Sequence, residues 1–355
     1  MLITWLLLST VSMANEPIHP RADILRRGYI EVPAAQARSA EPALPFAAHS
    51  LPWPVAFKDA RHSMGNTMAQ FQPFGDPYWH GGCDLRVARR APITAPVAGW
   101  VEAGHYDYAT RPDGTLQKFW KAWPETGEAT YFEVAIVTDE GCRFELHHVD
   151  RSSLTAPVLD ALNRGGGRIA AGEPVGRAIA WVGMDYDHVH YNIITPTDIR
   201  VNPEHASPLL PDTLAPRVLD AWMATAGSPT VHPFASGLPS VWGVHTFYLR
   251  VAEQKDSNIY VAPPALAELA FDSGEKTTWD FRERLMTELG IAPELLGFYA
   301  RSIRTTEGQT LRTEGGYGTG PVIVRLPVPT GAKGAFKIRL ADPAGNETLL
   351  TGTLL

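Results

Sequence analysis

The segments His80-Gly81-Gly82-Cys83-Asp84 and His188-Val189-His190 carry four side chains that can bind a metal or transfer a proton. Successive side chains on a β-strand alternate between faces, so residues two or four positions apart share a face. His80 and Asp84 are therefore expected on one face of a strand, and His188 and His190 on one face of another. Two such strands side by side would bring three or four ligands together, and a catalytic zinc needs three plus one open position.

The composition is that of a globular protein with many turns. Hydrophobic residues make up 45% and charged residues 19% of the 355 residues, and the chain contains 31 glycines and 30 prolines. That many turn-forming residues suit short strands better than long helices, so we expect a mainly β fold. The formal net charge of −7 argues against a nucleic-acid partner, because such proteins carry a basic surface.

The first fourteen residues, MLITWLLLSTVSMA, have the features of a signal peptide. An apolar core from Leu2 to Leu8 is followed by Ser12-Met13-Ala14, which predicts cleavage before Asn15. The apolar run is shorter than the ~20 residues that a membrane span needs, so we expect no transmembrane span in the mature protein. The prediction is a periplasmic or secreted protein. Because the n-region lacks Lys and Arg, a buried N-terminal segment is the alternative.

The remaining chain divides by pattern into four parts. Residues 15–50, rich in Ala, Pro and Arg, are expected to form an extension, either a plain linker or an inhibitory segment. A domain is expected over residues 51–210 and a connector over 211–236. Residues 237–355 predict a smaller β-rich domain, with a sandwich as one arrangement that fits its alternating strands.

Local patterns predict individual elements. Tyr131–Val137 and Cys142–His148 are expected to form a hairpin, and Asp107–Gly127 a long loop or hairpin. Short helices are expected over Val158–Leu162, Ala215–Ala226 and Thr278–Leu289.

The two cysteines, Cys83 and Cys142, leave their redox state open. In an oxidising compartment they could form a disulfide that closes a loop of roughly 60 residues, worth roughly 4 kcal/mol. Two buried free thiols are the alternative. Because Cys83 neighbours Asp84 on its strand, its thiol is expected to point away from the metal.

Further segments accompany the two histidine motifs in a fixed order. They are Ile93–Val101 (ITAPVAGWV), Leu146-His147-His148-Val149, the Gly172–Gly176 turn, and Asn202-Pro203 after the last motif. Together with HxxxD and HxH, this order resembles the lysostaphin-like (LytM-type) zinc metallo-endopeptidases, which cleave peptide bonds in peptidoglycan. The resemblance covers residues 51–210 and implies a LytM-like antiparallel β-sheet peptidase domain.

The resemblance also implies the residues of the site. His80, Asp84 and His190 would bind one zinc ion (Zn2+), and His148 and His188 would be the catalytic pair. One imidazole would take and pass on a proton, and the other would stabilise the developing charge. The sequence does not assign the two roles.

The central motif departs from the family pattern, because two histidines stand side by side. His147 therefore competes with His148 for the catalytic place. Strand parity favours His148, because it would share a face with Phe144 and Leu146 rather than with Glu145.

These features predict an exported zinc endopeptidase that hydrolyses stem peptides or bridges of peptidoglycan. A non-hydrolytic cell-wall binding or regulatory protein is one alternative, and a secreted zinc protease acting on proteins is another. The bond cleaved, the oligomeric state and the role of the C-terminal domain are not specified by the sequence.

Overall fold

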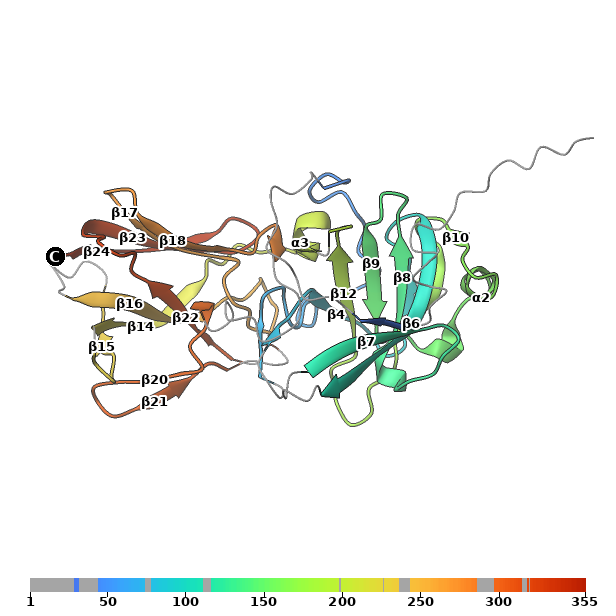
Figure 1. Ribbon diagram of the computed structural model, residues 1–355, viewed down its shortest axis with the longest axis horizontal. Helices are drawn as coiled ribbons and strands as arrows, with labels where there is room; N and C mark the ends of the chain where they lie inside the picture. The colour runs from blue at the N-terminus through green and yellow to red at the C-terminus, as the bar shows by residue number, and fades with distance from the viewer. Residues whose placement is uncertain are drawn as a thin grey trace, which may run out of the picture.

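The mainly β fold is confirmed by the computed structural model, which consists of several antiparallel sheets (Figure 1). The structure describes residues 29–31, 44–73, 78–110, 116–197, 199–225, 227–235, 243–285, 297–314, 318 and 320–355. The expected signal peptide, residues 1–14, and most of the expected extension lie outside these residues. In the described part of the chain, no helix combines the length and the apolar character that crossing a membrane requires.

A ten-stranded antiparallel sheet forms one half of the molecule (Figure 1). Its main path runs β1-β7-β6-β8-β9-β12-β13-β19, while β4 pairs with β12 and β10 with β6. The strands are β1 (Tyr29–Glu31), β4 (Cys83–Arg86), β6 (Gly99–Thr110), β7 (Leu116–Ala122), β8 (Phe132–Val137), β9 (Arg143–His147), β10 (Arg168–Ile169), β12 (His188–Ile194), β13 (Arg200–Val201) and β19 (Arg284–Leu285). Strand β4 is the neighbour of β12 that carries Asp84 into the sheet.

Short elements surround this sheet and join its strands. Two small ladders pair β2 with β3 and β5 with β11. The elements are β2 (Phe71–Gln72), β3 (Tyr78–Trp79), β5 (Pro92–Thr94), β11 (Pro174–Arg177), the 3-10 helices η1 (Ala129–Tyr131) and η2 (Arg151–Ser153), and the α-helices α2 (Ala156–Asn163) and α3 (Pro203–Ala206).

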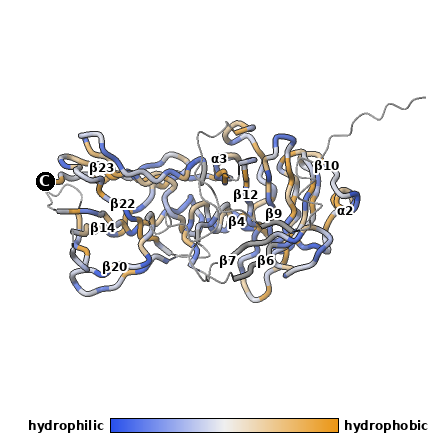
Figure 2. The backbone as a smooth tube through the Cα atoms, in the orientation of Figure 1, coloured by the Kyte–Doolittle hydropathy of each residue, from blue (hydrophilic) through white to orange (hydrophobic). Residues whose placement is uncertain are grey.

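The two faces of the central strands differ in character because side chains alternate along each strand. On β8, β9 and β12, one set of alternating residues belongs to a large hydrophobic core, as Val134, Leu146 and Tyr191 do. The other set contains most of the buried polar side chains of these strands, including Glu133 and Glu145. Apolar and polar residues accordingly alternate along the backbone of this half (Figure 2). The polar face is where the site residues gather.

The other half of the molecule consists of two four-stranded sheets that share one core, which we name the C-terminal sandwich (Figure 1). One sheet has the order β15-β14-β16-β22 and the other β18-β17-β23-β24, and β20 pairs with β21 beside them. The strands are β14 (Arg217–Thr225), β15 (His232–Pro233), β16 (Val244–Ala252), β17 (Leu266–Phe271), β18 (Lys276–Asp280), β20 (Ser302–Arg304), β21 (Thr310–Arg312), β22 (Val322–Pro327), β23 (Gly334–Ala341) and β24 (Glu347–Leu354). The expected connector thus contributes β14 and β15 to the sandwich.

Several local expectations are confirmed. The predicted hairpin is formed by β8 and β9, and the expected helical turn lies within α2. The segment expected as a long loop or hairpin contains the paired ends of β6 and β7.

Two helix predictions are wrong. Residues 215–226 contain strand β14, and residues 278–285 contain the end of β18 and all of β19, whereas residues 286–289 lie outside the described part. Strand β14 pairs with β16 over nearly its full length; Ala221 and Met223 pack against the sandwich core, and Trp222 and Ala224 are buried in a smaller cluster on the opposite face. Pairing and burial have outweighed a weak local helical spacing.

Both cysteines are free and buried in the hydrophobic core of the ten-stranded sheet. Of the two redox states considered, the structure therefore has the free thiols. Burial raises the pKa of Cys83 and raises that of Cys142 to about 11. Both thiols therefore remain protonated at neutral pH.

Candidate metal centre

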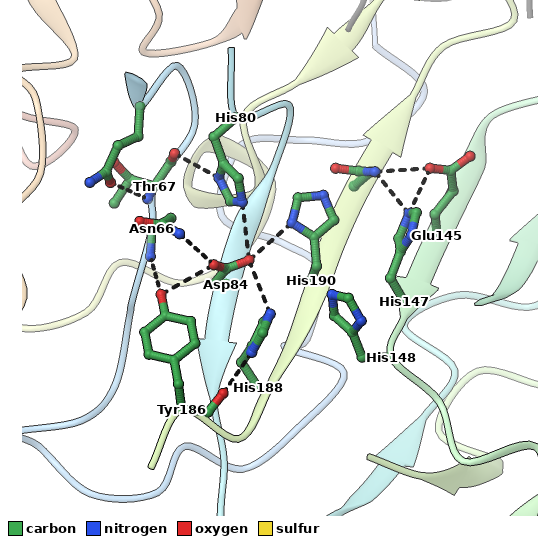
Figure 3. Close-up of polar contacts among 12 residues, drawn as sticks. Asn66, Thr67, His80, Asp84, Glu145, His147, His148, Tyr186, His188 and His190 are labelled. Carbon is green, nitrogen blue, oxygen red and sulfur yellow. Dashed lines mark hydrogen bonds and ion pairs between the residues drawn. The ribbon is translucent and has the colours of Figure 1, made fainter. Parts of the chain in front are cut away.

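The sheet register places Asp84 directly opposite His190 on the paired strands β4 and β12. Residues paired in this way have their side chains on the same face. His80 lies just before β4, and its Nε2 is 3.0 Å from Asp84 Oδ1 (Figure 3). His190 Nδ1 is also 3.0 Å from Asp84 Oδ1. The structure therefore brings together the three residues expected to bind the metal.

Gly82 explains why glycines stand inside the first motif. A Cβ at this position would lie 2.2 Å from Tyr191 O and 2.2 Å from Asn192 Oδ1. No real side chain tolerates such contacts, so only glycine lets the start of β4 come this close to β12. That close approach carries Asp84 to His190.

The donor set fits a zinc ion. One ligand atom each from His80, Asp84 and His190 lies within 4.8 Å of the others. Two imidazoles and one carboxylate form a typical donor set of a catalytic zinc with an open position. Bonds of about 2.0–2.1 Å to a tetrahedral ion would separate the donors by about 3.3 Å, close to the 3.0 Å observed for both pairs.

A second layer of hydrogen bonds orients these ligands (Figure 3). His80 Nδ1 donates to Thr67 O at 3.0 Å, which leaves Nε2 for a metal. Asp84 Oδ2 accepts bonds from Asn66 Nδ2 at 2.8 Å and Tyr186 Oη at 3.2 Å, which leaves Oδ1 for a metal. Such outer partners are typical of metal sites. Asn66, Thr67 and Tyr186 were not predicted from the sequence, because no local spacing identifies them.

The electrostatics of the three ligands suit metal binding. Burial opposes ionisation of Asp84, but the neighbouring His80 and His188 and the imidazole hydrogen bonds outweigh it, so its pKa lies well below the usual range. Burial, with His80 beside it, lowers the pKa of His190 to about 3. At neutral pH the site therefore offers an ionised carboxylate and a neutral imidazole, the forms that a metal requires.

The two histidines expected to be catalytic lie beside this group. The ring centroids of His148 and His188 are 4.6 Å apart, and His188 Nε2 is 3.7 Å from Asp84 Oδ1. His148 Nδ1 donates to Thr130 O at 2.5 Å, and His188 Nδ1 donates to Tyr186 O at 2.7 Å. Both rings are thereby held with Nδ1 as donor, and Nε2 remains the basic nitrogen.

Burial keeps both imidazoles neutral. Desolvation, followed by the nearby His188, lowers the pKa of His148 to about 3. Desolvation also lowers the pKa of His188. Trp181 contributes to this enclosure, since its ring stacks on His188 at 5.4 Å and meets His148 edge-on at 5.1 Å.

His148 lies near the candidate metal centre, but not for the expected reason that it shares a strand face with Phe144 and Leu146. Phe144 and Leu146 point into the hydrophobic core, whereas His147 is paired with His190 and shares its face. Strand β9 ends at His147, and His148 has a φ of 63°. This left-handed residue breaks the alternation and turns the His148 ring toward His188.

His147 belongs to a neighbouring polar group on the same face. Its Nε2 is 3.1 Å from Glu145 Oε2 and 3.4 Å from Glu133 Oε2. Arg143 donates from Nε to Glu145 Oε1 at 2.7 Å and also forms ion pairs with Glu133 and Glu102. These contacts direct the His147 Nε2 away from the metal ligands.

The C-terminal sandwich contacts the segment that carries the candidate metal ligand His80. Trp79, the residue before His80, lies in the sandwich core with ring centroids 5.1 Å from Phe281 and 5.5 Å from Tyr299. Tyr299 Oη donates to Ala69 O at 2.8 Å. The position of His80 therefore depends on side chains more than 200 residues later in the chain.

Comparisons with known proteins give only distant similarities. The sequence matches no family model and no curated protein. A solved structure described as the SpoIIQ–SpoIIIAH pore-forming complex is similar at 12% identity and a TM-score of 0.29, over 45% of this chain and 92% of that chain. The NMR solution structure of lysostaphin is similar at 12% identity and a TM-score of 0.19, over 84% of this chain and 96% of that chain. The candidate site is therefore defined by the geometry of its own side chains.

Proposed function

We propose that this protein is an exported, zinc-dependent endopeptidase of peptidoglycan, acting on stem peptides or bridges. One observation carries the proposal: the donor atoms of His80, Asp84 and His190 converge within 4.8 Å. The neutral imidazoles of His148 and His188 lie directly beside them. The motif order along the chain supports the choice of peptidoglycan, and the features of residues 1–14 support export.

The residues present define what the chain contributes to such a reaction. His80 Nε2, Asp84 Oδ1 and His190 Nδ1 would hold the zinc. When bound, zinc supplies a Lewis acid for the scissile carbonyl and for the attacking water. Asn66 and Tyr186 hold Asp84 Oδ2, so that Oδ1 stays turned toward the ion.

The proton transfers fall to the two remaining imidazoles. Because Nδ1 of each ring donates to a backbone carbonyl, only Nε2 can accept a proton. One imidazole takes the proton of the attacking water at Nε2 and delivers it to the leaving amine. The other imidazole, while neutral and held in this tautomer, can orient the water by accepting a hydrogen bond from it at Nε2. The equal tautomers of His148 and His188 leave the division of these roles open.

The test is hydrolysis of purified sacculi by residues 15–355 loaded with zinc. Chromatography with mass spectrometry would identify the released fragments, with and without a chelator. New peptide ends that disappear with chelator and in His190→Ala, but persist in the remote control His232→Ala, are the expected result. Tight binding to sacculi without any new ends would instead favour the non-hydrolytic alternative. Turnover of casein in preference to sacculi would favour a protease that acts on proteins.

N-terminal sequencing of the protein recovered from its own cells tests export, which an intact Met1 would contradict.

A further inference from the structure

A separate acidic cluster lies at the end of the C-terminal sandwich that faces the rest of the molecule. Asp212, Glu253 and Asp342 each offer a carboxylate oxygen, and these oxygens lie within 4.8 Å of one another. They come from three separate places in the chain: Asp212 precedes β14, Glu253 follows β16, and Asp342 follows β23. None of them belongs to the candidate zinc site.

The side chain of Glu253 is almost fully buried, and its carboxylate has no hydrogen-bond partner in the described part of the chain. Its exposed fraction is 1%, and neither of its carboxylate oxygens accepts a hydrogen bond from any residue that the structure describes. Asp212 Oδ2 also accepts none. Glu253 lines a small, partly open pocket together with Glu204 and Lys255. Buried polar groups normally have partners, so an unpartnered carboxylate aimed at two others indicates a bound species.

The charges in this group do not balance. In the part of the chain that the structure describes, the ion pairs of the group involve a single ammonium, that of Lys255. Its Nζ lies 2.6 Å from Glu204 Oε1 but 3.8 Å from Asp212 Oδ2, so Glu204 is its main partner. Lys255 can neutralise one of the four carboxylates, so ionisation of Asp212, Glu253 and Asp342 together in this poorly solvated place would need a further positive charge.

The carboxylates are held in position by neighbouring amides. Asn346 N and Nδ2 donate to Asp342 Oδ1 and Oδ2 at 2.9 and 2.7 Å. Asn346 Nδ2 also donates to Asp212 O at 3.1 Å, which ties the segment before β14 to the turn after β23. The backbone of Glu253 is fixed by two hydrogen bonds with Ala262. The cluster is therefore pre-arranged, which lowers the entropic cost of binding a ligand.

We propose that Asp212, Glu253 and Asp342 bind a hard divalent cation, calcium in the first place. All donors are oxygens, which favours calcium or magnesium over zinc. Calcium accepts mono- and bidentate carboxylates in irregular geometry, as three separate chain segments would provide, whereas magnesium demands a near-ideal octahedron. The ion would join the segment that enters the sandwich to the ends of β16 and β23. Burial and the neighbouring Asp212 and Asp342 raise the pKa of Glu253 to about 8, in keeping with a carboxylate that lacks its counter-ion.

The test uses the full chain, stripped over a chelating resin and reloaded with one equivalent of zinc. Calcium chloride is then titrated at about pH 7.5 while heat release and thermal unfolding are followed. One calcium ion per chain is expected, and saturation should raise Tm by roughly 5–10 °C, as a ligand at about 100 times its Kd does for a domain of this size. Magnesium at the same concentration should give a smaller rise.

Two isosteric variants locate the site. Glu253→Gln should bind no calcium and should be more stable than the parent without calcium, because one buried charge is removed. Asp342→Asn should lose most of the calcium response. Glu140→Gln makes the same chemical change at an exposed position and should respond to calcium as the parent does.

The proposal would be overturned by either of two results. No heat and no Tm change with calcium, together with a Glu253→Gln variant no more stable than the parent, would mean that Glu253 is simply protonated. An undiminished calcium response in Glu253→Gln would place the ion elsewhere. Neither result bears on the zinc site, whose test is hydrolysis, so this proposal and the proposed function can fail separately.

Discussion

Two neighbouring groups on one face of the ten-stranded sheet contain similar residues but are built for different purposes. One is His80, Asp84 and His190, and the other is Glu133, Glu145 and His147; each places three ligand-type atoms within 4.8 Å. The second group also binds the guanidinium of Arg143, which pairs with both glutamates. In the first group, the contacts of Asp84 come from imidazoles and the neutral donors of Asn66 and Tyr186.

The difference shows that proximity of donors does not by itself make a metal site. Where a guanidinium lies among the carboxylates, the protein supplies its own counter-ion. Where a buried carboxylate faces only imidazoles and neutral donors, a metal can supply the positive charge. The predictions below test this contrast, beginning with the largest expected effect.

Removal of a ligand from the first group should abolish zinc binding. In His190→Ala, the zinc content measured by mass spectrometry of the metal should fall from one ion per chain to none, and hydrolysis of sacculi should fall to background. Glu133→Gln in the second group should keep its zinc. Equal zinc loss in both variants would contradict the contrast.

The neighbouring residues His147 and His148 should differ in their importance for hydrolysis. His148→Gln and His188→Gln should each lower kcat by about 10²–10⁴-fold, the usual contribution of a general acid or base, while zinc content stays unchanged. His147→Gln should lower kcat far less, because its Nε2 is directed at Glu133 and Glu145. If His147→Gln caused the larger loss, the roles of the two neighbours would be reversed.

Removal of the Arg143 guanidinium should destabilise the protein around Glu133 and Glu145. Arg143→Met leaves Glu102, Glu133 and Glu145 buried without their guanidinium, and should lower the free energy of unfolding by about 3–5 kcal/mol. Urea unfolding of zinc-loaded protein measures this, with the exposed Arg89→Met as control. A change as small as that of the control would show that the ion pairs contribute little.

Loss of an outer hydrogen bond should weaken the first group moderately. Tyr186→Phe removes one of the two donors to Asp84 Oδ2 and leaves Asn66 in place. Zinc affinity, measured by competition with a chelating dye, should fall by roughly 10-fold, the lower end of the range for such partners. An unchanged affinity would mean that Asn66 alone orients the carboxylate.

The loss of kcat/KM at acid pH should be displaced to lower pH than that of an ordinary imidazole base. An ordinary imidazole gains a proton at about pH 6.5 and would lose its function as a base below that value. Because its pKa is lowered to about 3, His148 stays neutral as the pH falls through 6.5, and burial lowers the pKa of His188 in the same direction. The value of kcat/KM on sacculi should therefore show no loss centred near pH 6.5. Such a loss, absent in His148→Gln, would identify His148 as a normally titrating base.

The sequence analysis succeeded where local pattern carries the information. Alternation predicted the hairpin of β8 and β9, and the spacing in HxxxD and HxH predicted the residues that converge. It failed for β14 and β18, whose helical spacing was overruled by pairing with β16 and β17. It also failed in its parity argument, because the positive φ of His148 is a local break that alternation cannot foresee.

By itself, the sequence determined the mainly β class and the donor types of the candidate metal centre, because strand alternation and residue type are local properties. The tertiary structure alone decided which atoms act: Asn66 and Tyr186 meet at Asp84 across about 120 residues of chain. It also decided that Trp79 is enclosed by Phe281, Phe298 and Tyr299 beside the ligand His80. Such contacts depend on the packing of distant segments, which no spacing within a single motif encodes.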